Sequence, residues 1–125
     1  MSKNVFTLLI FALYIFSVPF ACAKTYEKHY NEHWCTAQNG ILEYTTEDKS
    51  RVDCLTKEYA VECDHAYKWK EAVGQSLFYA IQTGKRPGIL LIVKDPVKER
   101  KYVERLNTVA EKYDIKVWHI TPNDL

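Results

Sequence analysis

Hydrophobic positions along the chain follow two spacings, and polar or glycine-containing segments separate the regions where each applies. Between residues 67 and 82, hydrophobic or small residues recur every three or four positions, which predicts an amphipathic helix that ends before Gly84. Residues 88–93 form a continuous hydrophobic run, which is typical of a buried strand. The hydrophobic pattern therefore predicts a domain that contains both helices and strands.

The other segments complete the order of elements. Residues 26–38, followed by Asn39-Gly40, predict a first helix, and residues 97–113 predict a third. Short segments rich in β-branched and aromatic residues predict the strands. The order becomes α, β, β, β, α, β, α, β, which indicates an antiparallel meander continued by parallel strands in a mixed sheet. The expected strands are residues 41–46, 51–56, 59–64, 88–93 and 115–120.

The N-terminal residues 1–23 have the features of a signal peptide. Lys3 precedes a hydrophobic stretch over residues 5–15, and Ala21-Cys22-Ala23 has the small-x-small arrangement after which signal peptidase cuts. We therefore expect residues 24–125 to form a single domain that is periplasmic or secreted. An uncleaved membrane anchor and a lipid anchor on Cys22 are the alternatives.

Composition limits the size and chemistry of this domain. The 125 residues are 47% hydrophobic and include 17 Lys plus Arg against 16 Asp plus Glu, and removal of Lys3 leaves 16 of each. Because the chain is neutral and has no basic tail, it does not belong to the class of strongly basic proteins that coat DNA. Three cysteines would remain, Cys35, Cys54 and Cys63, so at most one intramolecular disulfide can form, and spacing alone leaves its partners open.

The predicted hairpins bring acidic residues together. A two-residue loop at Lys57-Glu58 would place Asp53 directly opposite Glu62, with Cβ atoms ~5 Å apart. A three-residue loop over residues 47–49 would add Glu43 opposite Asp53, whereas a two-residue loop there would break this row. Like charges so close favour a cation between them, and an all-oxygen ligand set suits Mg²⁺ or Mn²⁺.

The predicted helix over residues 67–82 adds two polar side chains. Lys68 and Gln75 lie seven residues apart on one stripe, and helical side chains lean toward the N-terminus, so both can reach the strand ends. Lys68 could orient a hydroxide or stabilise charge on a phosphate, and Gln75 could position a substrate. Asp64 is expected to cap this helix rather than to act in the site.

Residues 40–80 resemble the PD-(D/E)XK nuclease superfamily, in which a Glu, an Asp, a Glu-x-Lys pair and often a helical Gln build one metal site. The similarity is to small exported bacterial members, and it departs from the family at Asp64, where the lysine would stand; Lys68 is the nearest replacement. The residues that carry it are Trp34-Cys35, Gly40, Glu43, Arg51 to Thr56, Ala60 to Glu62, Lys68-Trp69, Glu71 to Gln75, Tyr79-Ala80 and Thr83 to Lys85.

This resemblance implies a restriction-endonuclease-like α/β fold and a metal-dependent nuclease that hydrolyses phosphodiester bonds, with DNA favoured over RNA. It implies Glu43, Asp53 and Glu62 as ligands of Mg²⁺ or Mn²⁺, and Lys68 and Gln75 as further catalytic residues. It also favours a disulfide between Cys35 and Cys54, if one forms, with Cys63 free.

Two other functions compete with the nuclease. His29-Tyr-Asn-Glu32-His33 matches the H-x-x-E-H pattern of zinc peptidases, in which two histidines bind Zn²⁺ and the glutamate activates water. The second alternative is a non-catalytic exported binding protein on a degenerate nuclease fold, because a neutral chain holds a polyanion weakly.

Overall fold

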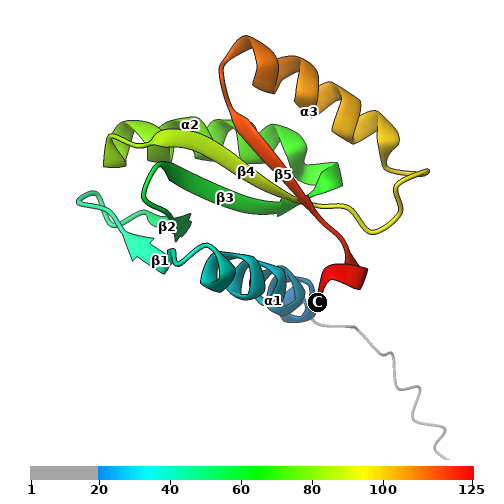
Figure 1. Ribbon diagram of the computed structural model, residues 1–125, viewed down its shortest axis with the longest axis horizontal. Coiled ribbons are helices and arrows are strands. Elements are labelled where there is room, and N and C mark those ends of the chain that lie inside the picture. Colours follow the sequence, from blue (N-terminus) through cyan, green and yellow to red (C-terminus); the bar gives the residue numbers. More distant parts are fainter. Residues whose placement is uncertain (1–19) are drawn as a thin grey trace, which may run out of the picture.

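The chain folds into one mixed sheet with helices on both faces (Figure 1). The computed structural model describes the backbone of residues 20–125 and the side chains of residues 27–125. The elements follow the order that the hydrophobic pattern predicts, so the expectation of an α/β domain with a mixed sheet is confirmed. They are α1 (Phe20–Ala37), β1 (Ile41–Thr45), β2 (Arg51–Leu55), β3 (Tyr59–His65), α2 (Trp69–Thr83), β4 (Arg86–Ile92), α3 (Arg100–Lys112) and β5 (Lys116–Ile120), with short 3₁₀ turns at Ala66–Lys68 and Pro122–Asp124.

Most of the predicted signal peptide lies outside the described residues, since its hydrophobic stretch precedes Phe20. The backbone of α1 continues through the expected cleavage position after Ala23. No helix among residues 20–125 combines the length and the hydrophobicity that crossing a bilayer requires.

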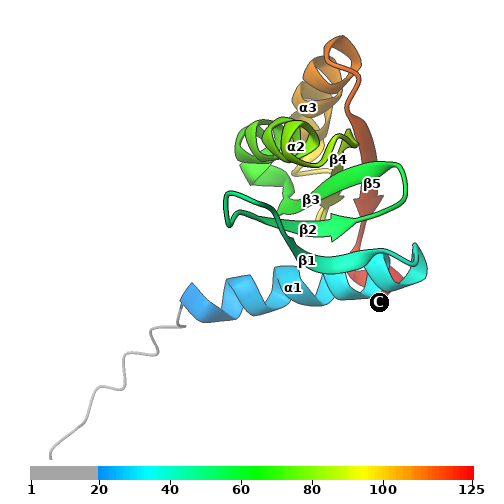
Figure 2. The same ribbon diagram turned by 90° about the vertical axis from the view of Figure 1, so that its left-hand side faces the viewer.

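The five strands lie in the order β1-β2-β3-β4-β5, antiparallel up to β3 and parallel from β3 to β5. α1 covers one face of the sheet, and α2 and α3 cover the other (Figures 1 and 2). A hydrophobic core lies on each face of the sheet, and alternate residues of β4 pack into one or the other. Leu90 and Ile92 pack on the α1 side, and Ile89 and Leu91 pack on the side of α2 and α3. Burial on both faces explains why this strand is continuously hydrophobic in sequence.

Both predicted hairpin registers are confirmed. Leu55 pairs with Ala60 across the β2–β3 turn. In the β1–β2 hairpin, the Thr46 N–H donates to the Ser50 carbonyl oxygen at 2.9 Å. This hydrogen bond closes a loop of three residues, 47–49. Lys49 has φ 71°, the left-handed conformation that commonly ends such a loop.

A disulfide fastens α1 to β2. Cys35 and Cys54 are joined, with their Cα atoms 5.7 Å apart, and Cys63 is a free, buried thiol, so the expected pairing is confirmed. Gly40 packs directly against this disulfide. A Cβ atom added at Gly40 would lie 2.5 Å from Cys54 Sγ and 2.7 Å from Cys35 Sγ. The turn after α1 therefore needs glycine because the disulfide occupies the space of a side chain.

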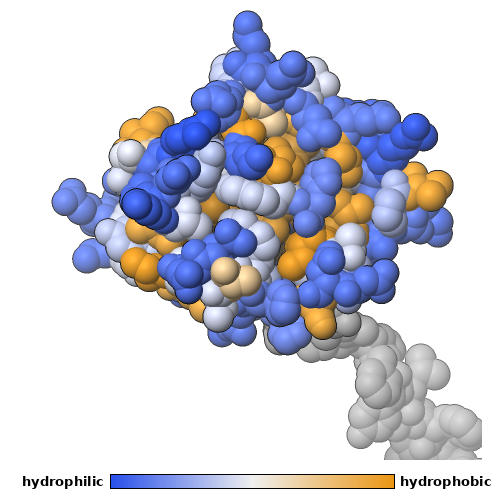
Figure 3. Space-filling model, in the orientation of Figure 1, coloured by the Kyte–Doolittle hydropathy of each residue, from blue (hydrophilic) through white to orange (hydrophobic). Residues whose placement is uncertain are grey.

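One face of the domain is mainly polar. On the face shown in Figure 3, hydrophilic side chains predominate and hydrophobic ones form small, separate patches. The buried hydrophobic residues come from the strands and from the helix faces that pack on them.

Gly40→Ala tests the packing around the disulfide. We expect it to lower the free energy of unfolding by about 1–3 kcal/mol, the usual cost of overpacking, or to leave titratable thiols at positions 35 and 54. Gly74→Ala is the matched control, because nothing lies within 4 Å of its added Cβ and alanine favours a helix interior by about 0.5–1 kcal/mol. Urea denaturation and thiol counting measure both variants. Equal stabilities for the two would contradict the packing argument.

Candidate functional site: a buried cluster of carboxyl groups

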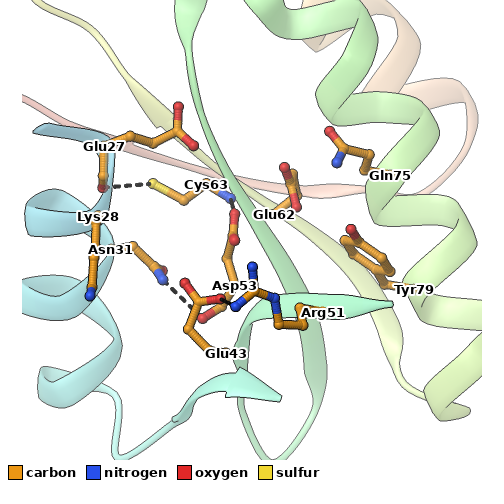
Figure 4. Close-up of a pocket in the computed structure, with 10 residues that line it drawn as sticks. All are labelled: Glu27, Lys28, Asn31, Glu43, Arg51, Asp53, Glu62, Cys63, Gln75 and Tyr79. Atoms are coloured by element: carbon orange, nitrogen blue, oxygen red, sulfur yellow. Dashed lines mark hydrogen bonds and ion pairs between the residues drawn. The ribbon is translucent and has the colours of Figure 1, made fainter. Parts of the chain in front are cut away.

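A pocket of about 660 Å³ opens where α1, the β1–β3 strands and α2 approach one another (Figure 4). Both faces of the sheet contribute to it, because α1 and α2 lie on opposite sides. Most of its lining side chains are polar. They are Glu27, Lys28, Asn31, Glu43, Arg51, Asp53, Glu62, Cys63, Gln75 and Tyr79.

Asp53 and Glu62 meet because of the hairpin register. Leu55 pairs with Ala60 and Cys54 with Val61, so continuing this register places Asp53 directly opposite Glu62. The Cys63 N–H donates to Asp53 Oδ2 at 2.8 Å, and the two carboxyl groups share a side-chain hydrogen bond. The predicted convergence of these two acids is therefore confirmed.

Asp64 and Glu27 extend the cluster. Residues alternate along a strand, so Asp64 lies on the same face of β3 as Glu62, and both are at most 5% exposed. Glu27 of α1 has a side-chain hydrogen bond with Asp64. The expectation that Asp64 caps a helix is wrong: it is a β3 residue, and Lys68 occupies the N-cap of α2 without a side-chain cap. The chain stays extended through His65, which carries Asp64 into the interior.

Burial and mutual repulsion raise the pKa of all four acids. Burial, followed by the charges of Asp53 and Asp64, raises the pKa of Glu62 to about 10. Burial also raises the pKa of Asp53 to about 6, although the Cys63 N–H opposes this rise. The pKa of Asp64 rises to about 6 and that of Glu27 to about 7, again mainly through burial. At neutral pH, Glu62 therefore retains its proton.

Among the side chains of residues 27–125, no ion pair involves Asp53, Glu62 or Asp64. Glu43 lies at the outer edge of the pocket, beside Arg51, with Glu43 Oε2 3.7 Å from Arg51 Nη1. Its register places it opposite Asp53, as predicted, because Leu42 pairs with Cys54 and Tyr44 with Val52. Its backbone departs from the regular strand with φ 52°.

The two predicted helical residues have different positions. Gln75 lines the pocket and has a side-chain hydrogen bond with Tyr79. Lys68 is not among the lining residues, and its Nζ lies 5.9 Å from the centre of the Tyr67 ring. Its positive charge nevertheless lowers the pKa of Glu27 and Asp64, against the larger effect of burial, so it acts electrostatically on the same acids.

Asn31 of α1 is a further polar residue of the pocket. Its Nδ2 donates to the Asp53 carbonyl oxygen at 2.9 Å, and its Oδ1 is buried without a hydrogen-bond partner among the described residues. Sequence reasoning missed Asn31, Glu27 and the role of Asp64. The available signals were the Glu62-x-Asp64 alternation on one strand face and the i, i+4 spacing of Glu27 and Asn31 on a helix.

The donor chemistry fits a hard divalent cation. Within residues 27–125 no three Asp, Glu, His or Cys side chains are already arranged as a metal-binding group. The pocket nevertheless supplies the carboxylate and amide oxygens that Mg²⁺ and Mn²⁺ prefer, including the unpaired Asn31 Oδ1. Asp53 and Glu62 would hold such an ion in exchange for their proton, and Glu43, paired with Arg51, would contribute from the rim.

The H-x-x-E-H residues lie elsewhere. His29 and His33 are exposed on α1, and Glu32 Oε1 lies 3.6 Å from Lys28 Nζ. None of these three residues lines the pocket. The structure of the described residues thus brings no third metal ligand to the zinc-peptidase pattern.

Comparison with known proteins finds two distant viral relatives, both from Acanthamoeba polyphaga mimivirus. The chain is 28% identical to the putative KilA-N domain-containing protein L33 over 91 residues. This aligned region is 73% of this chain and 35% of the relative. The chain is 30% identical over 76 residues to the putative KilA-N domain-containing protein R878, covering 61% and 20%. The chain thus spans about a third or less of these relatives. No family model and no solved structure matches it.

These comparisons correct the family assignment. The resemblance to PD-(D/E)XK nucleases rested on short motifs around Glu43, Asp53, Glu62 and Gln75. The detectable similarity is instead to KilA-N domain-containing proteins, and neither a family model nor a solved structure of the nuclease superfamily matches. The assignment to that superfamily is therefore wrong, and the site must be interpreted from its own chemistry.

The raised pKa values predict an unusual dependence of stability on pH. Between the ordinary carboxyl pKa of about 4 and the folded values of about 6 to 10, the folded protein binds more protons than the unfolded chain. Without divalent cations, the free energy of unfolding should therefore fall as pH rises from 5 to 8.5, by about 1.4 kcal/mol per pH unit for each extra proton. Urea denaturation in EDTA at several pH values measures this slope.

Glu62→Gln should reduce this slope above pH 7, where Glu62 is the acid that still holds its proton. Glu111→Gln, an exposed residue of α3, makes the same chemical change away from the pocket and should keep the slope of the unmodified protein. Stability that stays constant or increases from pH 5 to 8.5 in the unmodified protein would contradict the prediction.

Proposed function

We propose that this protein is a divalent-cation-dependent hydrolase of phosphodiester bonds in nucleic acid, with the carboxyl pocket as its active site. The main support is the convergence of Asp53 and Glu62 in one pocket, where neither acid forms an ion pair among residues 27–125 and the Arg51 charge only partly offsets the rise in the pKa of Asp53. Buried like-charged groups are unfavourable unless a proton or a cation lies between them. A cation that replaces the proton would relieve the same repulsion.

The ligand set of the proposed ion combines residues from three elements. Asp53 and Glu62 would supply carboxylates from β2 and β3, and Asn31, which lines the same pocket, would supply its amide oxygen from α1. Glu43 is the predicted ligand at the rim. When bound, the ion would act as a Lewis acid toward a phosphoryl oxygen and lower the pKa of bound water.

Two residues of α2 and its N-terminus would act on the substrate. Lys68 influences the same carboxyl groups electrostatically, and its ammonium group would stabilise negative charge on the phosphate. Gln75 lines the pocket beside Tyr79 and would position a nucleotide by hydrogen bonding. We expect DNA rather than RNA to be the substrate.

An oxidising compartment agrees with this proposal. The Cys35–Cys54 disulfide is buried and joins two elements that line the pocket, and such bonds persist mainly in the periplasm or outside the cell. We therefore propose that the protein acts in the periplasm or is secreted.

The first test is cation binding. In differential scanning fluorimetry at pH 7.5, millimolar Mn²⁺ should raise the Tm of the unmodified protein, because an ion that binds only the folded state stabilises it. Glu62→Gln should abolish this rise, whereas Glu111→Gln should preserve it. The absence of a Mn²⁺-induced rise in the unmodified protein would contradict the proposed ion site.

The second test is hydrolysis. The purified residues 24–125 with Mg²⁺ or Mn²⁺ should cleave fluorescently labelled DNA, and Asp53→Asn and Lys68→Ala should each lower the rate by about a hundredfold or more, the usual loss when a stabilising catalytic group is removed. Circular dichroism should show that both variants fold. Cation binding without cleavage of single- or double-stranded DNA or RNA would instead support a non-catalytic binding protein.

A further inference from the structure

Beside the pocket, aromatic residues alternate with lysines in one short segment. Residues 67–70 are Tyr67, Lys68, Trp69 and Lys70, which comprise the last two residues of the 3₁₀ turn after β3 and the first two residues of α2. Tyr67 is 55% exposed, although Ala66 before it is completely buried. Trp69 packs, half-buried, against the core beneath α2 and α3. The segment therefore presents one aromatic ring to solvent and is fixed to the core by the next.

A chain of contacts connects Tyr67 to the carboxyl pocket. Glu27 lines the pocket, and its Oε2 lies 3.9 Å from Nε2 of His65. The His65 ring in turn stacks on Tyr67, with ring centres 5.6 Å apart and planes only 10° from parallel. Because His65 is buried, this stacking holds Tyr67 in a defined orientation next to the acids.

The lysines place positive charge around the exposed ring. Lys68 Nζ lies 5.9 Å from the centre of the Tyr67 ring, and Lys70 Nζ lies 5.6 Å from that of Trp69. Neither lysine forms an ion pair within the part of the chain whose side chains are described. Their ammonium groups are therefore available to phosphates. An oriented aromatic ring with adjacent ammonium groups is the combination that binds single-stranded nucleic acid.

We propose that residues 67–70 form a stacking platform for an unpaired base of single-stranded DNA, with Lys68 and Lys70 contacting the phosphates on either side of that base. In a duplex the base faces are already stacked, so the platform favours single strands over duplexes. The proposal deepens the proposed function, on which it rests for its substrate, by naming the kind of strand that the pocket receives.

Binding measured without hydrolysis tests the platform. The probe is a 5′-fluorescein-labelled oligothymidylate of 12 nucleotides, and fluorescence anisotropy is recorded in EDTA and low salt with the purified protein. Stacking contributes about 1–3 kcal/mol per base, so Tyr67→Ala should weaken binding by about fivefold to 150-fold. Tyr67→Phe keeps the ring and should bind within about twofold of the unmodified protein.

Tyr113→Ala is the matched control, because Tyr113 is 60% exposed at the far end of α3 and should not affect binding. Lys70→Ala should reduce the slope of log K against log salt by about 0.7, the value for one single-strand phosphate contact. The duplex of the probe with oligodeoxyadenylate should bind more weakly than the probe alone.

Equal binding by the unmodified protein and Tyr67→Ala would overturn the platform, as would equal losses in Tyr67→Ala and Tyr113→Ala. Tighter binding of the duplex would overturn the preference for single strands. Since EDTA prevents any cation-dependent reaction, these outcomes are independent of whether the protein hydrolyses DNA. A failure of the platform and a failure of the proposed activity are therefore distinguishable.

Discussion

The organisation of this domain around its pocket depends on how the repulsion between half-buried Asp53 and buried Glu62 is relieved. Asp53 and Glu62 are brought together by the backbone register of β2 and β3, and this register is set by the hairpin turn and by the hydrophobic residues beside it. Two charges 4 Å apart repel by about 4 kcal/mol at an effective dielectric constant of 20. The structure reduces this repulsion by leaving Glu62 protonated, and a divalent cation would reduce it in another way.

The pocket is assembled across the sheet, and α1 is the element that completes it. This helix contributes Glu27 and Asn31, and it is joined to β2 by both the Cys35–Cys54 disulfide and the bond from Asn31 to the Asp53 carbonyl. A covalent and a polar connection to the same strand keep α1 over the acids. Both connections join α1 to the strand that carries Asp53.

Charge has a local rather than a global role in this protein. The chain carries nearly equal numbers of basic and acidic residues, so its overall field steers a polyanion only weakly. The proposed binding of nucleic acid would therefore rely on individual basic groups, namely Arg51 in the pocket and Lys68 and Lys70 beside it. Such an arrangement favours short-range recognition of a strand segment over non-specific binding along a long duplex.

The sequence by itself determined the order of elements, the mixed sheet and the facing of Asp53 and Glu62, because periodicity and turn length are local properties that act over a few residues. Helical spacing also indicated Gln75, whereas the spacing of the cysteines left the Cys35–Cys54 pairing open and only the fold brings these two residues together. Tertiary structure decided the rest: Glu27 and Asn31 reach the pocket through the packing of α1, a long-range contact. Asp64 joins the acids because the packing of the helices buries the face of β3 that carries both Glu62 and Asp64. The pKa values of the acids likewise depend on burial, which no local pattern specifies.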